Sequence, residues 1–200
     1  MNGGRTRRHL GALALTVGVL AAGLAACTDD PSPHPSATTP STTPVTSTAL
    51  PSPTATPPTA PKAEPTPKSA EAFVKYFWAV YNYAYETRDQ KILKTLSAPH
   101  CLFCQDTIKA IEKLVEDGSY IKGSEIQVGV AVAPPTKPAA GLIIATVISE
   151  RPGMTIASDG STVGQTKGVR DMKSEIALDW TGGKWIVRDL ANDEKTGKPW

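Results

Sequence analysis

The stretch from Thr28 to Lys68 limits where this chain can fold, because it is dominated by proline, threonine, serine and alanine. It has few large apolar side chains, among them Val45 and Leu50, so it cannot bury enough surface to offset its chain entropy. Its proline runs favour extended polyproline geometry, in which roughly 40 residues at about 3.1 Å each would reach on the order of 130 Å. We therefore predict a disordered stalk over 27–68, either a plain spacer or one that carries O-linked sugars.

An export signal precedes the stalk. The charged region near the N-terminus contains Arg5, Arg7 and Arg8. An uncharged apolar run from Leu10 to Ala26 follows, and this order is the pattern of a signal peptide. The run is shorter than the about 20 apolar residues that a membrane-spanning helix needs, and glycines interrupt it. We therefore predict that residues 1–26 are a signal peptide.

The signal ends in the lipobox formed by Leu24, Ala25, Ala26 and Cys27. An ordinary secretory cleavage site also uses small residues, but a thiol directly after such a run favours lipoprotein processing. Cleavage would leave Cys27 first in the mature chain, carrying a diacylglyceryl thioether with palmitate among its acyl chains. Because two acyl chains give stable anchoring, we predict a protein held by its lipid on the outer face of the cytoplasmic membrane.

The distribution of charge argues against a nucleic-acid-binding protein. The formal net charge of +2 depends on the three arginines that leave with the signal peptide. From Ser69 onward acidic and basic residues balance, and no cluster of lysine and arginine with interleaved aromatic residues occurs. The electrostatic footprint of nucleic-acid binding is therefore missing, and we expect no nucleic acid among the partners.

Residues 69–200 have the length of one domain with a single core. Ser69 is the expected N-cap of a first helix, with Glu71 in the first turn, where a carboxylate meets the positive end of the helix dipole. Apolar residues then recur at helical spacing, and they are Phe73, Val74, Phe77, Trp78, Tyr81, Ala84 and Tyr85. Most of them should belong to the core, but we take Tyr81 and Tyr85 as candidates for the lining of a pocket.

Two shorter helices should follow over 90–96 and 102–117, and Pro99 ends the first of them. The apolar pattern then changes to the period of two that strands show. Strands are predicted over 126–132 and 142–148, a hairpin or long excursion around 154–163, and a last hairpin over 176–187 in which Trp180 and Trp185 face each other. Helices followed by strands imply an α+β fold, and we predict three N-terminal helices packed on a curved antiparallel sheet.

Cys101 and Cys104 carry the most distinctive chemistry of the domain. A thioredoxin-like site needs this spacing after a strand, and haem attachment needs a histidine in place of Gln105. Structural zinc takes four ligands, whereas the domain offers only three, His100 and the two thiols. In an exported protein whose remaining cysteine is lipidated, the two thiols are expected to pair. We predict a disulfide that joins the second helix to the third, and no metal or other cofactor.

His100 is the single histidine of the domain, and it could act as a general base beside a nearby carboxylate. A lone histidine in a loop next to a disulfide is more often a surface residue. The sequence shows no serine, histidine and aspartate in the order of a catalytic triad. It also shows no phosphate-binding glycine loop and no cluster of metal ligands. We therefore keep His100 as a catalytic candidate and assign no catalytic residue.

Three segments of the chain carry a resemblance to known proteins. They are Ser69-Ala-Glu-Ala-Phe-Val-Lys-Tyr-Phe, Asn82-Tyr83-Ala84-Tyr85 and Ser97-x-Pro-x-Cys-x-x-Cys104. They resemble a family of lipoproteins of high-GC Gram-positive bacteria with a C-terminal domain of unassigned function, and the order of elements is similar to the nuclear transport factor 2-like cone. This resemblance implies a cone over about 69–190 and a homodimer formed through its sheet. It also implies that isomerases, dehydratases and binding modules are relatives.

These observations predict a membrane-anchored envelope lipoprotein whose domain is a non-catalytic binding module. Its partner would be a small molecule, an envelope component or another protein. Two alternatives stay open at this point. One is an isomerase-like or dehydratase-like enzyme that uses the cone cavity with His100 as base. The other is a purely structural envelope protein, whose cavity would be filled by the aromatic residues of the first helix.

Overall fold

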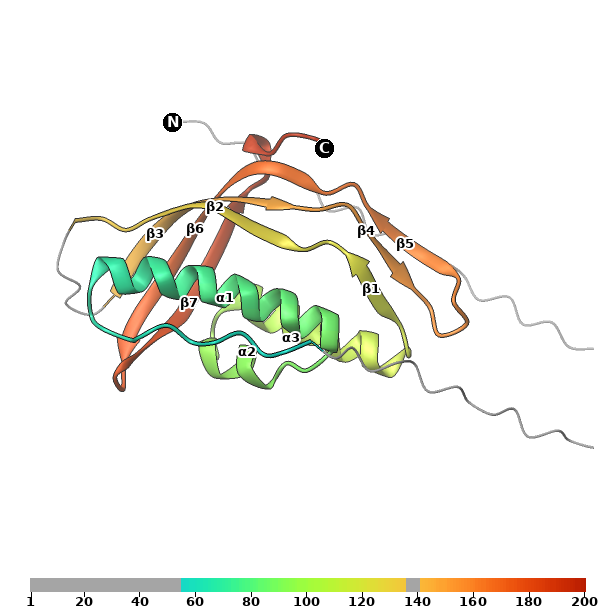
Figure 1. Ribbon diagram of the computed structural model, residues 1–200, viewed down its shortest axis with the longest axis horizontal. Coiled ribbons are helices and arrows are strands. Elements are labelled where there is room, and N and C mark those ends of the chain that lie inside the picture. The colour runs from blue at the N-terminus through green and yellow to red at the C-terminus, as the bar shows by residue number, and fades with distance from the viewer. Residues whose placement is uncertain (1–54, 136–140) are drawn as a thin grey trace, which may run out of the picture. The chain divides into compact units, whose positions relative to one another are not determined.

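The computed structural model describes residues 55–135 and 141–200 (Figure 1). The predicted signal peptide, the lipobox with Cys27 and most of the predicted stalk lie outside these residues. The described end of the stalk, 55–66, forms no helix or strand.

The last residues before the first helix contact the folded domain. Ser69 Oγ donates to the carbonyl of Lys62 (3.1 Å) and accepts from the backbone N–H of Glu64 (3.0 Å). The carbonyl of Glu64 accepts from Trp185 Nε1 (3.0 Å). Thr66 is the N-cap, because its Oγ1 accepts from the backbone N–H of Ser69 (3.2 Å). The expectation that Ser69 caps the helix is therefore wrong, since its hydroxyl instead holds the preceding segment.

The helices are α1 (Pro67–Thr87), α2 (Lys91–Leu96) and α3 (Leu102–Glu116). Their positions confirm the three predicted helices to within a few residues. Arg88 is the C-cap of α1, and its φ of 61° is left-handed. Glu71 does not meet the helix dipole as predicted: its Oε1 accepts from the backbone N–H of Ala133 (2.9 Å), and this bond ties the start of α1 to the chain that follows the strand over 126–132.

The strands of the described chain form two antiparallel sheets (Figure 1). The three-stranded sheet has the order β1 (Tyr120–Gly123), β4 (Gly153–Ile156) and β5 (Thr162–Thr166). The four-stranded sheet has the order β2 (Ile126–Val132), β3 (Gly141–Glu150), β6 (Val169–Thr181) and β7 (Lys184–Asp193). A short 3₁₀ helix, η1 (Glu194–Thr196), follows β7.

The prediction of three helices packed on a curved sheet is wrong. The structure is a mixed α+β fold in which strands dominate and divide between two sheets. The division falls where β1 passes into β2 and β3 passes into β4. Gly123 and Ser124 have φ values of 83° and 63° there, and Pro152 has no N–H to donate. Apolar alternation does not reveal this break, because it reports which face of a strand is buried and not where a ladder is interrupted.

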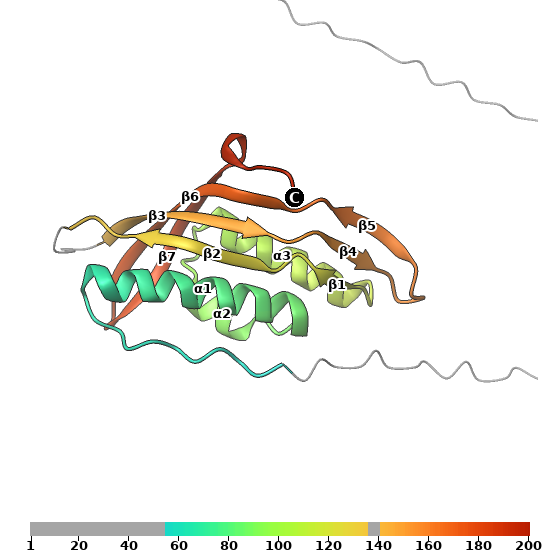
Figure 2. The same ribbon diagram turned by 45° about the horizontal axis from the view of Figure 1, so that its top comes forward.

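The first helix lies at the junction of the two sheets. α1 contacts β1 of the three-stranded sheet and also β2 and β3 of the four-stranded sheet, whereas α2 and α3 contact β7. Both views show the three helices on the same side of the four-stranded sheet (Figures 1 and 2). The C-terminal half of α1 therefore borders the place where the ladders separate.

The core lies between α1 and the four-stranded sheet. Its largest fully buried side chains include Phe77 and Trp78 of α1 and Trp185 of β7. The last hairpin has the predicted register, because Trp180 pairs with Trp185. Their rings meet edge to face, with centroids 5.0 Å apart.

The outer face of β2 and β3 carries large apolar side chains that are exposed: Val130, Val132 and Ile143. Inward-pointing residues of β3, such as Leu142 and Ile144, are buried, so this exposed face is the one turned away from the core. The homodimer predicted through the sheet would cover these side chains, and it stays a prediction.

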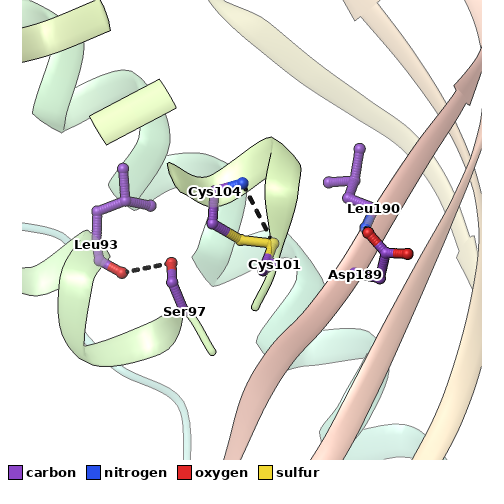
Figure 3. Close-up of a disulfide and its surroundings, with 6 residues drawn as sticks. All are labelled: Leu93, Ser97, Cys101, Cys104, Asp189 and Leu190. Atoms are coloured by element: carbon purple, nitrogen blue, oxygen red, sulfur yellow. Dashed lines mark hydrogen bonds between the residues drawn. A yellow bond between two sulfur atoms is a disulfide. The ribbon is translucent and has the colours of Figure 1, made fainter. Parts of the chain in front are cut away.

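Cys101 and Cys104 form the predicted disulfide (Figure 3). Both residues are fully buried, and Figure 3 shows them between Leu93 and Leu190. Cys101 is the N-cap of α3, where its Sγ accepts from the backbone N–H of Cys104 (3.2 Å). The bridge therefore closes the first turn of α3 and does not join α3 to α2, as we had expected from the sequence.

Replacing Cys101 and Cys104 together by alanine should lower the free energy of unfolding by about 2 kcal/mol. This is the low end of the usual range, because the bridge closes a short loop. Urea unfolding of the full-length protein, followed by far-UV circular dichroism, measures the change. Wild-type protein kept under reducing conditions is the control and should lose a similar amount. A loss below about 0.5 kcal/mol in both samples, typical of neutral surface changes, would show that the bridge is dispensable for stability.

Candidate functional site

A cavity of about 740 Å³ lies beside the C-terminal half of α1. Tyr81, Asn82 and Tyr85 of α1 form one wall, and β1 with the bend that follows it forms another. Glu150 lines the cavity from the end of β3. The loop between β4 and β5 contributes the small residues Ala157, Ser158 and Gly160. The cavity lining therefore includes the ends of β1 and β3, where the two sheets separate.

Tyr81 and Tyr85 are one helical turn apart, so they share a face of α1. Their ring centroids lie 4.8 Å apart. The ring of Tyr81 also packs against Trp78 (5.1 Å) and stacks on Phe103 of α3 (6.0 Å), which connects the cavity wall to the core. Burial raises the pKa of both phenols, so both are neutral at physiological pH and can donate hydrogen bonds.

Asn82 fixes the bend between β1 and β2 to the helix. Its Nδ2 donates to the carbonyl of Ile126 (2.8 Å), and its Oδ1 accepts from the backbone N–H of the same residue (2.9 Å). A side-chain amide can make this pair of bonds because it carries a donor and an acceptor side by side. Since Ile126 is the first residue of β2, this clamp positions the bend at Gly123 and Ser124 relative to the tyrosines.

Glu150 is the half-buried acidic group of the cavity. Burial raises the pKa of its carboxyl, and the Ser124 side chain offsets part of that effect. Burial is the main cause that raises the pKa of Tyr81, Tyr85 is the next, and the charge of Glu150 comes last. For Tyr85, too, the charge of Glu150 raises the pKa less than burial does. The backbone carbonyl of Glu150 accepts a hydrogen bond from Trp200 Nε1, so the end of β3 is also tied to the C-terminal residue.

Four more charged residues line the cavity. Glu86, Lys122 and Glu125 are exposed at its rim, and Arg88 is partly buried. The guanidinium of Arg88 donates to the carbonyl of Ser119 (3.5 Å). None of the ion pairs found in the described part of the chain includes a charged residue of this lining.

The structure places Tyr81 and Tyr85, the two residues predicted to line a pocket, together in the wall of this cavity. His100 is exposed in the turn before α3 and does not belong to the lining. Cys101 and Cys104 are buried around the start of α3, away from the cavity lining. The predicted lipidation site and lipobox, Cys27 with Leu24, Ala25 and Ala26, lie outside the described residues.

Sequence reasoning missed Asn82 and Glu150 as site residues. Asn82 is a polar side chain within the aromatic stretch of α1, and a helix position of that kind is a signal for a buried hydrogen bond. Glu150 comes two residues after the apolar strand predicted over 142–148, so its charge lies where that strand ends. Both signals are visible in the sequence, but their partners come from distant segments.

Within residues 55–135 and 141–200, no group of three histidine, cysteine, aspartate or glutamate side chains is arranged to hold a metal ion. Over the same ranges, no helix combines the length and the apolar character that crossing a membrane requires.

Comparisons with known proteins bear on the family and on the fold. No curated protein gives a significant match to the chain. A solved structure, the intermembrane space region of the chloroplast protein ARC6, is similar at 8% sequence identity and a TM-score of 0.45, over 66% of this chain and 98% of that chain. The sequence model of a family of unknown function, DUF6318, matches residues 40–191. This match spans the described end of the stalk, the three helices and nearly all of the strands, and the chain therefore belongs to the DUF6318 family.

Proposed function

We propose that this domain is a binding module that accepts a small molecule in the cavity beside Tyr81 and Tyr85. The lipid on Cys27 would hold the module at the outer face of the cytoplasmic membrane. The cavity carries the proposal, because its volume of about 740 Å³ falls within the range of about 300–1,000 Å³ that is common for ligand sites. It also combines aromatic walls with a few convergent polar groups, as such sites do.

A purely structural role would require that the aromatic residues of α1 fill the interior. Phe77 and Trp78 are buried in the core, but Tyr81 and Tyr85 line a cavity. This arrangement supports a binding role over a structural one.

A second candidate function is proton transfer on a molecule bound in the same cavity. His100 does not fit the role of base, because it is exposed and does not belong to the lining. Glu150 would take that role, since a carboxyl with a raised pKa inside a cavity is a common property of general acids and bases. An enzyme of this kind would keep its substrate unconverted in the Glu150→Gln variant.

Native mass spectrometry of the full-length lipoprotein, purified from the membranes of its host, tests both candidates. We expect the wild-type protein to carry a co-purifying small molecule. Ser158→Trp places a large side chain in the wall of the cavity and should abolish that adduct. Glu175→Trp is the matched control, because Glu175 is exposed on β6 and does not belong to the lining, and it should keep the adduct.

Wild-type protein free of any adduct, or an adduct that Ser158→Trp retains, would contradict binding in this cavity. The Glu150→Gln variant separates the binding module from the enzyme. A bound molecule with the same mass and fragmentation in both proteins, even at lower occupancy in the variant, supports the binding module. A difference between them, as between substrate and product, supports the enzyme.

A further inference from the structure

The carboxylate of Glu150 lies in the cavity without a cationic partner. No ion pair in the described ranges includes it, and the pKa of its carboxyl responds to burial and to the Ser124 side chain. Arg88, the partly buried cation of the lining, directs its guanidinium at the carbonyl of Ser119. Because removing a carboxylate from water is costly unless it is paired, a ligand that supplies a positive charge to this half-buried group would gain free energy.

Two aromatic rings line the cavity together with this carboxylate. The rings of Tyr81 and Tyr85 are inclined by 55° with centroids 4.8 Å apart, and Tyr120 of β1 also contributes to the lining. Glu150 lines the same cavity as both rings. An aromatic ring attracts an ammonium ion through its quadrupole, and the carboxylate adds a direct charge interaction.

Apart from Glu150, the charges of the lining balance, with Glu86 and Glu125 against Arg88 and Lys122. Glu150 therefore leaves the lining with an excess of negative charge. Glu86, Glu125 and Lys122 are exposed, so water and salt screen their effect on a charged ligand. Glu150 and Arg88 are partly buried and are screened less, but the guanidinium of Arg88 is directed at the carbonyl of Ser119.

We infer that the cavity binds a small organic ammonium ion, whose charge lies beside the rings of Tyr81 and Tyr85 and the carboxylate of Glu150. This inference rests on the proposed binding function and names the class of its ligand. The cavity volume of about 740 Å³ leaves room for a body attached to the ammonium group, beside β1 and the loop between β4 and β5.

A matched pair of probes tests the charge preference directly. Choline and 3,3-dimethyl-1-butanol have nearly the same shape. The positively charged quaternary nitrogen of choline is replaced by a neutral carbon in 3,3-dimethyl-1-butanol. Isothermal titration calorimetry of the full-length protein in detergent gives the Kd of each. We expect choline to bind at least about tenfold more tightly, because aromatic rings attract a desolvated cation but do not attract a neutral group of the same size in this way.

Glu150→Gln keeps the shape of the side chain and removes its charge. It should weaken choline binding about tenfold, because it removes the attraction between two charges at a partly buried position, and it should leave the binding of 3,3-dimethyl-1-butanol unchanged. Glu125→Gln is the control at the exposed rim and should change choline binding less than about twofold, because exposed charges are screened. Far-UV circular dichroism verifies that both variants are folded.

Equal affinity for the two probes, no measurable binding of choline, or choline binding that Glu150→Gln leaves unchanged would overturn the inference. In each of these cases, a co-purified molecule that Ser158→Trp displaces would still support a binding module with a different ligand. Failure of the ligand class and failure of the binding function are therefore distinguishable.

Discussion

Replacing Trp185 by alanine is expected to lower the free energy of unfolding by about 3–5 kcal/mol, the usual cost of removing a large aromatic side chain from a core. Trp185 is 1% exposed, and its ring packs edge to face against Trp180. The substitution also removes the hydrogen bond from Nε1 to the carbonyl of Glu64. Urea unfolding of the full-length protein, followed by far-UV circular dichroism, should show a large fall in the midpoint.

Trp185→Phe separates the packing of this side chain from its hydrogen bond. It keeps a buried aromatic ring but cannot donate to Glu64, so the segment before α1 should become accessible to proteases. The cost attributable to the lost hydrogen bond is about 1 kcal/mol. An alanine variant that loses no more than about 0.5 kcal/mol, as surface substitutions do, would show that the last hairpin does not contribute to the core.

Replacing Asn82 by alanine should lower the free energy of unfolding by about 2–4 kcal/mol. The two groups that Asn82 satisfies, the N–H and the carbonyl of Ile126, would lose their partners, and each buried unsatisfied group costs about 1–3 kcal/mol. The same change releases the bend between β1 and β2 from α1. We therefore also expect the native mass spectrum to show loss of the small-molecule adduct, in addition to the lower midpoint in urea.

Asn82→Asp tests the hydrogen-bonding pattern through its dependence on pH. The carboxylate can still accept from the Ile126 N–H, but only the protonated acid can donate to the Ile126 carbonyl. This interaction raises the folded-state pKa of the new carboxyl above its unfolded value. Its contribution to stability should then be complete below the unfolded pKa and be lost as pH rises through the folded pKa. Asn192→Asp, at an exposed position of β7, is the control, and an equal pH dependence in both variants would contradict the clamp.

The local elements followed from short-range patterns. The apolar residues of α1 recur at the helical period, and the structure has a helix over Pro67–Thr87. The turn at Gly182 and Gly183 sets the register that pairs Trp180 with Trp185. Each of these features depends on neighbours within a few residues, where periodicity and turn chemistry are strong predictors.

The caps were less predictable than the elements. Ser69 and Glu71 are good capping residues, yet the structure uses Thr66 as the N-cap. The side chains of Ser69 and Glu71 bond instead to Lys62, Glu64 and Ala133. Contacts with segments outside the helix replaced the local interactions that a cap would have made, because a side chain takes whichever backbone partner folding brings within reach.

The candidate site, too, was predictable from the sequence only where its residues are close together in the chain. Tyr81 and Tyr85 could be proposed as pocket lining because they lie one turn apart at the end of an aromatic helix. The pairing of Asn82 with Ile126 joins residues that are far apart in the chain, and so does the cavity lining that Glu150 shares with both tyrosines. No periodicity connects such residues, so the acidic group of the cavity and the clamp of its bend escaped sequence analysis.

The residue pattern alone was enough to locate three helices, the last hairpin and the cysteine pair, because propensity, amphipathic period and turn residues act over short distances. It did not establish that the strands divide into two sheets. That division depends on the positive φ values of Gly123 and Ser124 and on their approach to Pro152, a contact between segments nearly thirty residues apart in the chain. The cavity exists because the ladders separate there beside α1, and this geometry arises only when the long-range contacts have formed.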